Sequence, residues 1–243
     1  MLNLSSELDS KISRLDQATQ ALAAGQPIMI FDDADREGET DFFFSGASVL
    51  PENIRFLRKN GGGLIFIAVD SESANSFGLP FLEHSFTISS GKYPVLSNLM
   101  KHKIPYDTNS SFSISINHKD TYTGITDNDR ALTVSQFSNL VSDLSSDNAS
   151  DISDSFSSNF RTPGHVPICI ANESLLNGRQ GHTELIVSLM KLGNLAPVAV
   201  GCEILSDNGN ALGPEDAQKL AEEQGYVFLE GEEIKDAWQK SEF

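Results

Sequence analysis

The sequence predicts one α/β or α+β domain that spans residues 1–243. Short apolar runs typical of strands are mixed along the whole chain with amphipathic segments typical of helices. No internal repeat and no linker divides the chain. The length of 243 residues and the hydrophobic fraction of 39% are sufficient for one large core.

The N-terminal half alternates helix and strand signals. Spacings of three and four predict a first helix, which carries Leu8, Ile12, Leu15, Thr19 and Leu22. Gly25 is placed to end this helix. Apolar or aromatic runs predict strands at 27–31, 41–50 and 64–69. Pro51 suits the first turn of a helix that reaches about Lys59, and the glycines at 61–63 follow it.

The C-terminal half repeats this mixture after a less regular stretch. Residues 78–109 contain three prolines and scattered polar residues, so we expect long loops that act as a lid or binding loop. Strands are predicted at 112–117, 165–171, 197–205 and 226–229. Helices are predicted at 132–144, 182–193 and 214–223. The Ser/Asp-rich segment 145–158 predicts a solvated loop.

Composition limits the classes of partner. The net charge of −17, from 17 basic and 34 acidic residues, disfavours binding to nucleic acid or to an anionic membrane. No apolar run approaches the roughly 18 residues of a membrane span, and no targeting signal is evident. Cys169 and Cys202 are too few for a disulfide framework, and we interpret them as small core residues. We therefore expect a cytoplasmic protein that binds neither nucleic acid nor membrane.

The segment Asp32 to Asp41, DDADREGETD, is the strongest candidate site. Its carboxylates are Asp32, Asp33, Asp35, Glu37, Glu39 and Asp41. Five of these would share one face of an extended chain, which is costly unless a cation or raised pKa values relieve the repulsion. Mg²⁺ is the natural cation, and Gly38 allows the backbone to turn. A solvated acidic loop is the alternative, but loops at strand ends often carry sites.

A second candidate is the segment 177–184, NGRQGHTE. Glycines on both sides of Arg179, followed by the start of a helix at His182-Thr183, are typical of a phosphate-binding turn. The Gly-Lys-Ser/Thr ending of a P-loop is absent. His182 fits a metal ligand or a base, and an ordinary helix-start residue is the alternative.

Three further features carry weaker signals. Arg161 and His165 flank the turn signal Pro163-Gly164. A histidine at this position is either an acid–base catalyst or an ordinary loop residue. The segment 121–131 offers hydroxyl groups near a helix start, which fits either ligand binding or N-capping. Glu203 ends an apolar strand, where it is either catalytic or simply exposed to solvent.

Taken in order, these motifs resemble those of the 3,4-dihydroxy-2-butanone 4-phosphate synthases of riboflavin biosynthesis, over about residues 26–209. The segments are DDADREGETDFFFSGA, TGITDNDRA, RTPGHVPI, GRQGHTE and AVGCEIL, and DREGETD resembles the archaeal branch. The resemblance implies a three-layer α+β domain with a mixed sheet, and a homodimer with active sites at the subunit interface. It implies a lyase that converts D-ribulose 5-phosphate to formate and 3,4-dihydroxy-2-butanone 4-phosphate with Mg²⁺, or with Mn²⁺ as the alternative ion.

The resemblance also assigns roles to single residues. The metal ligands would be Glu37 and His182. The catalytic residues would be Glu39, Asp41, Glu203 and a His165 from the partner subunit. The substrate-binding residues would be Arg36, Asp41, Arg161, Arg179 and Thr183. Two alternative functions are another Mg²⁺-dependent isomerase or aldolase acting on sugar phosphates, and a phosphosugar-binding module without catalysis.

Overall fold

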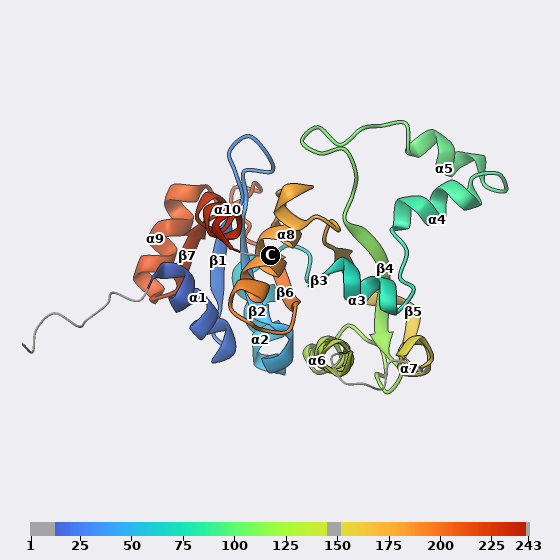
Figure 1. The fold of residues 1–243 in the computed structure, drawn as a ribbon, viewed down its shortest axis with the longest axis horizontal. Helices are drawn as coiled ribbons and strands as arrows, with labels where there is room; N and C mark the ends of the chain where they lie inside the picture. The colour runs from blue at the N-terminus through green and yellow to red at the C-terminus, as the bar shows by residue number, and fades with distance from the viewer. Residues whose placement is uncertain (1–12, 145–151, 242–243) are drawn as a thin grey trace, which may run out of the picture.

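A seven-stranded mixed sheet forms the centre of the computed structural model, which describes residues 13–144 and 152–241 (Figure 1). The strands are β1 (Ile28–Phe31), β2 (Thr40–Ser45), β3 (Phe66–Val69), β4 (Phe112–His118), β5 (Phe160–Ile170), β6 (Val198–Glu203) and β7 (Val227–Glu230). Their order across the sheet is β4-β5-β3-β6-β2-β1-β7. The pairs β1–β7 and β3–β5 are parallel, and the other neighbours are antiparallel.

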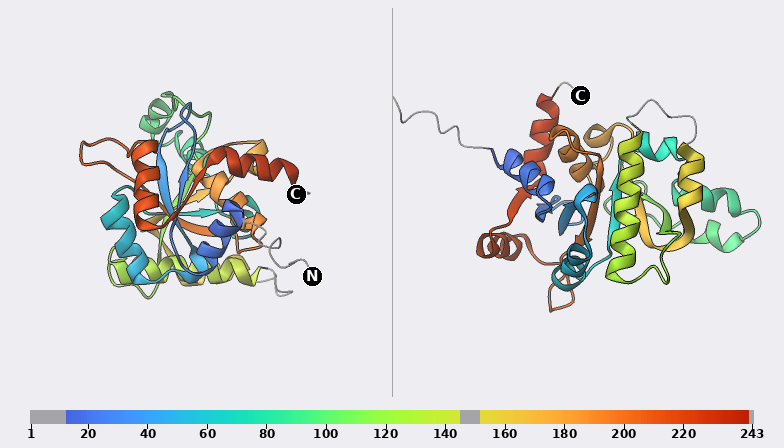
Figure 2. Two further views of the ribbon diagram at one scale, coloured as in Figure 1. Left: turned by 90° about the vertical axis from the view of Figure 1, so that its left-hand side faces the viewer. Right: turned by 90° about the horizontal axis from the view of Figure 1, so that it is seen from below.

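Helices cover both faces of this sheet (Figure 2). The α-helices are α1 (Arg14–Ala23), α2 (Pro51–Phe56), α3 (Ser71–Ser76), α4 (Leu82–Ser89), α5 (Pro94–Leu99), α6 (Asp127–Asp143), α7 (Ile152–Asn159), α8 (His182–Leu192), α9 (Pro214–Gln224) and α10 (Gly231–Lys240). One core contains side chains of α1, α8 and α10, and the other contains side chains of α2, α6 and α9. The three-layer α+β arrangement is therefore confirmed.

The central strands are apolar along their length because both of their faces are covered. Successive side chains alternate between the two faces, so Ile28 and Ile30 of β1 lie in the core under α8 and Met29 lies in the opposite core. On β2, the side chains of Phe42 and Phe43 lie in opposite cores in the same way. Strands buried on both faces show continuous apolar runs in place of polar alternation. Full burial of each such side chain contributes about 1.5–3 kcal/mol.

Several predicted boundaries agree closely with the structure. Helix α1 is capped by Ser13 and is followed by Gly25, whose φ of 71° is the left-handed conformation that favours glycine. Leu8 and Ile12, assigned to the same helix, lie outside the described residues. Helix α6 starts directly after Thr126, whose hydroxyl accepts from the main-chain N–H of Asp129, so the N-cap interpretation of that segment is confirmed.

The expectation of long loops across 78–109 is wrong. This segment contains the helices α4 and α5, which project beyond the β4 end of the sheet (Figure 1). Pro94, interpreted as a loop signal, is the first residue of α5, where its missing N–H costs nothing. Neither helix has a buried residue, so their sequences lack the apolar periodicity that predicts a helix.

Other boundaries also differ from the prediction. Residues 152–158 of the expected solvated loop belong to α7, because Phe156 is buried and stacks on Phe160 with ring centroids 5.1 Å apart. Residues 145–151 lie outside the described part of the chain. Strand β5 begins at Phe160 and not at His165, and helix α10 was not predicted. Within 13–144 and 152–241, no helix combines the length and the hydropathy that crossing a membrane requires.

Candidate active site

The acidic segment folds into a turn between β1 and β2. Asp32, at the end of β1, is buried, and its two carboxylate oxygens accept the main-chain N–H groups of Glu37 and Glu39, both at 3.1 Å. Gly38 has a φ of 66°, which permits the reversal. The extended arrangement with five carboxylates on one face is therefore not adopted. Asp33 points to Lys235 on α10, with 3.2 Å between Oδ2 and Nζ.

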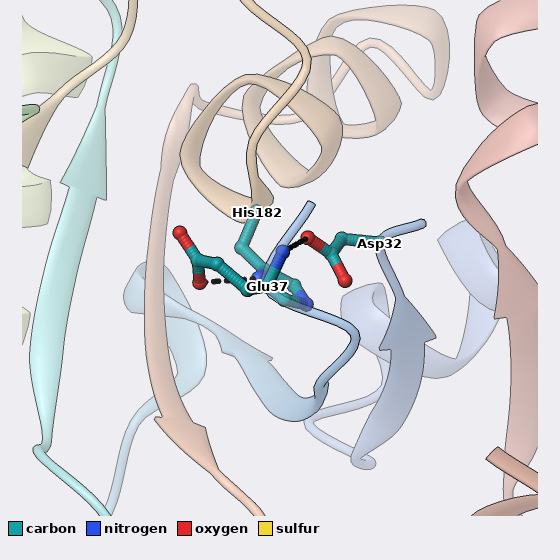
Figure 3. A group of neighbouring side chains, drawn as sticks. All are labelled: Asp32, Glu37 and His182. Carbon is teal, nitrogen blue, oxygen red and sulfur yellow. Dashed lines mark hydrogen bonds and ion pairs between the residues drawn. The ribbon is translucent and has the colours of Figure 1, made fainter. Parts of the chain in front are cut away.

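The turn brings Glu37 to His182, which is the first residue of α8 (Figure 3). His182 is 5% exposed, and its Nδ1 lies 3.5 Å from Glu37 Oε2. Its Nε2 lies 3.7 Å from Asp41 Oδ1 on β2. Ligand atoms of Asp32, Glu37 and His182 all lie within 4.8 Å of one another. The prediction that the fold joins Glu37 to the distant His182 is confirmed.

These neighbours shift one another's pKa values. Burial alone would lower the pKa of His182, but the negative charges of Asp41 and Glu37 raise it to about 9. Burial holds the pKa of Asp41 well above its ordinary value. The pKa of Glu39 is raised by burial and by the charges of Glu37 and Glu203. Burial opposes ionisation of Glu37 as well, yet the adjacent His182 ring keeps the pKa of Glu37 below its ordinary value.

This cluster fits a divalent cation. Both ring nitrogens of His182 and Oδ1 of Asp41 are buried without a hydrogen-bond partner among the described residues. Buried polar atoms are rarely left in that state, and a cation would satisfy them. Imidazole nitrogen and carboxylate oxygen are both metal donors. Asp32 is the weakest member of the set, because its oxygens already accept hydrogen bonds from the turn.

A cavity of about 70 Å³ opens beside the cluster. Its lining residues are Glu37, Asp41, Phe66, Ser111, Phe112, Cys169, Arg179, His182, Thr183 and Glu203. Asp41 on β2 and Glu203 on β6 are cross-strand partners, so their carboxylates enter from adjacent strands. The main-chain N–H of Leu64 donates to Glu203 Oε2 at 2.7 Å. Gly63 leaves room for that carboxylate, since a Cβ there would lie 2.3 Å from the same oxygen.

An arginine pair lies next to this cavity and shares one carboxylate. Asp107 Oδ2 lies 2.5 Å from Arg179 Nε and 3.1 Å from a terminal nitrogen of Arg36. Glu184, which is fully buried, lies 2.6 Å from the Nη1 atom of Arg179. A larger cavity of about 580 Å³ is lined by Arg36, Arg179 and residues 105–108. Neither residue was predicted from the sequence, because Asp107 lies in a segment without a regular pattern and Glu184 carries no signal beyond its place near the start of a helix.

Three of the proposed site residues line neither cavity, and Glu39 is one of them. Arg161 donates to the main-chain oxygens of Thr121 and Tyr122, and His165 contacts Asn117. Neither lines the space around His182 in the described chain. Thr183 does line it, with its hydroxyl 3.4 Å from that of Ser111.

Comparison with known proteins agrees with this architecture. The family model for 3,4-dihydroxy-2-butanone 4-phosphate synthase matches residues 16–237. The synthase of Methanothermobacter thermautotrophicus is 40% identical over 225 residues, which cover 92% of this chain and 95% of the relative. The synthase of Archaeoglobus fulgidus is 38% identical over 227 residues, which cover 93% and 94% of the two chains.

Solved structures share the fold. The synthase of Candida albicans superposes with a TM-score of 0.69 at 25% identity, over 95% of this chain and 99% of that one. A synthase structure described as a complex with two magnesium ions gives a TM-score of 0.71 at 24% identity, over 93% and 96% of the chains. The family model and the archaeal relatives together show that this chain belongs to the 3,4-dihydroxy-2-butanone 4-phosphate synthase family.

Proposed function

We propose that this chain is a lyase of riboflavin biosynthesis that converts D-ribulose 5-phosphate to formate and 3,4-dihydroxy-2-butanone 4-phosphate. The observation that carries the proposal is the position of His182, held between Glu37 and Asp41 beside a cavity that also contains Arg179. A cation site and an anion site therefore adjoin each other. A phosphorylated sugar with neighbouring oxygens fits both, and residues 1–243 act as one catalytic domain.

Glu37 and His182 would hold the divalent ion. Both have metal-donor atoms facing a common space, and Asp32 fixes the turn that carries Glu37. When bound, the ion stabilises negative charge that develops on the substrate oxygens. Mg²⁺ agrees with the magnesium complex of a neighbour that shares the fold. Mn²⁺ is the alternative ion, because it shares the preference of Mg²⁺ for carboxylate ligands such as Glu37.

Arg179 and Thr183 would bind the phosphate, with Arg36 beside them. Arg179 is held by ion pairs to Asp107 and Glu184, which orient its guanidinium group for a further anion. The start of helix α8 adds a positive dipole end next to Thr183. Asp107 already lies on both arginines, so a phosphate would have to share or displace that carboxylate.

Glu39, Asp41 and Glu203 would transfer the protons. Burial raises the pKa of Asp41 well above its ordinary value, and burial with the charges of Glu37 and Glu203 raises the pKa of Glu39. Both carboxyl groups therefore hold a proton more tightly than an exposed one, which suits proton donation. Glu203 is oriented by the main chain of Leu64 and faces Asp41 across the strand pair. Asp41 and Glu203 line the cavity, and three carboxyl groups with different surroundings can serve a reaction that removes and returns protons at successive carbons.

A homodimer would bring His165 and Arg161 into the site of the partner subunit. Both are exposed in one chain, and Arg161 contacts the loop that carries Tyr122, which is 94% exposed. An aromatic residue this exposed fits an interface. Mixing His165→Ala with Glu37→Gln protein tests this, because a mixed dimer would contain one intact site. Restored activity supports a shared site, and no restoration on mixing speaks against it.

One assay tests the function itself. Ribulose 5-phosphate and Mg²⁺ are supplied, and formate and remaining substrate are both measured, with EDTA as the control. Formate equal to the substrate consumed, and its loss with EDTA, supports the proposal. Consumption of the substrate without release of formate would instead indicate an isomerase or aldolase. Binding of the substrate without its consumption would indicate a phosphosugar-binding module. The buried, free thiols of Cys169 and Cys202 agree with a reducing cytoplasm as the place of action.

A further inference from the structure

Asn117 contacts His165 in a way that fixes the state of the ring. Asn117 lies on β4 and is almost fully buried, whereas His165 lies on the paired strand β5 and is exposed. The pairing is irregular between Ile116 and Asn117, so the main-chain N–H of His165 is not used in the regular ladder. It donates to Oδ1 of Asn117 at 2.8 Å.

This bond settles the orientation of the Asn117 amide. A main-chain N–H can only donate, so the amide atom that meets it must be the oxygen. The amide nitrogen Nδ2 therefore faces the other way and lies 3.0 Å from Nδ1 of the His165 ring. Since Nδ2 can only donate, Nδ1 must accept and cannot carry a proton. The proton of the neutral ring is then on Nε2.

The surroundings of Asn117 hold this orientation in place. Nδ2 also lies 3.4 Å from the main-chain oxygen of Thr123, so both of its hydrogens face acceptors. Gly124 provides the space, because a Cβ at that position would lie 2.0 Å from Nδ2. Its φ of 94° is also a conformation that favours glycine. A reversed amide would place two donors together at the His165 N–H and lose both acceptor contacts.

We infer that Asn117 is a positioning residue that holds His165 as the Nε2–H tautomer, so that the exposed edge of the ring offers a proton donor and not a base. The catalytic meaning of this tautomer rests on the proposed function, in which His165 meets the substrate in the partner's site. His165 would then donate a hydrogen bond or a proton to a substrate oxygen. An aspartate at position 117 would impose the opposite tautomer, because its oxygen would draw the proton to Nδ1.

Nitrogen NMR of histidine-labelled protein tests the tautomer directly. The chain has five histidines, and His165→Gln identifies the signals to be followed. At about pH 8.5, where an ordinary histidine is neutral, we expect an unprotonated Nδ1 and a protonated Nε2 in the intact protein. Asn117→Asp should exchange the two signals and lower kcat for formate release about 100-fold, the scale of one acid–base group. Asn128→Asp, the same change at an exposed position in the first turn of α6, should alter neither.

Two results would overturn the inference. One is a protonated Nδ1 in the intact protein. The other is an Asn117→Asp variant that exchanges the signals but keeps or increases the rate of formate release. If the intact protein released no formate at all, the proposed function would fail, and the NMR signals would still decide whether Asn117 sets the tautomer.

Discussion

Raising the pH should destabilise the metal-free protein through His182. Burial alone would lower the pKa of this ring, but the charges of Asp41 and Glu37 raise it to about 9. In the unfolded chain a histidine titrates near 6.5. Between these values the folded state holds one proton more than the unfolded state, so stability falls as pH rises. The stabilisation is complete below about pH 6.5, and about 3 kcal/mol is lost as pH passes through about 9.

Denaturant unfolding in EDTA, at pH values from about 6 to 10, measures this effect. Wild type should lose about 1.4 kcal/mol per pH unit between about pH 7 and 9, and His182→Gln should lose much less. The comparison of wild type with His182→Gln is needed because Asp41, whose pKa is raised by burial, contributes its own loss of stability as pH rises. Saturating divalent metal should flatten the wild-type curve, since a ligand histidine is unprotonated. Equal slopes for the two metal-free proteins would refute this electrostatic account.

Three further predictions concern the neighbouring groups. Arg179→Lys should raise KM for ribulose 5-phosphate at least about tenfold with a smaller effect on kcat, because lysine cannot form both ion pairs of the guanidinium group. An unchanged KM in steady-state kinetics would contradict this prediction. Gly63→Ala should lower kcat about tenfold or more by displacing Glu203, whereas Gly91→Ala, with open space around it, should not. Mn²⁺ should bind more tightly than Mg²⁺ in calorimetric titrations, and His182→Gln should reduce that preference.

The core and the acidic turn were predictable because each depends on local chemistry. Continuous apolar runs at 27–31 and 64–69 predict strands, and the structure confirms them as β1 and β3, whose side chains enter both cores. Many carboxylates within ten residues imply a cation or shifted pKa values, and the structure shows both raised and lowered ones. The joining of Glu37 to His182 followed from motif order, since no local pattern links residues so far apart in the chain.

The parts that were missed depend on tertiary contacts. Helices α4 and α5 have no buried face, so their sequences lack the apolar period that predicts a helix. Asp107 matters because its loop reaches Arg36 and Arg179, which no spacing in the sequence encodes. The roles of His165 and Arg161 stay predictions, because they require a second copy of the chain.

Formate release by the wild-type protein and by Glu37→Gln tests the central claim most directly. The account predicts one formate for each ribulose 5-phosphate consumed by the wild type with Mg²⁺. It predicts no turnover by Glu37→Gln, with an unchanged circular dichroism spectrum, because the variant loses a metal ligand and keeps the shape of the turn. Substrate loss without formate, or a Glu37→Gln protein as active as the wild type, would contradict it.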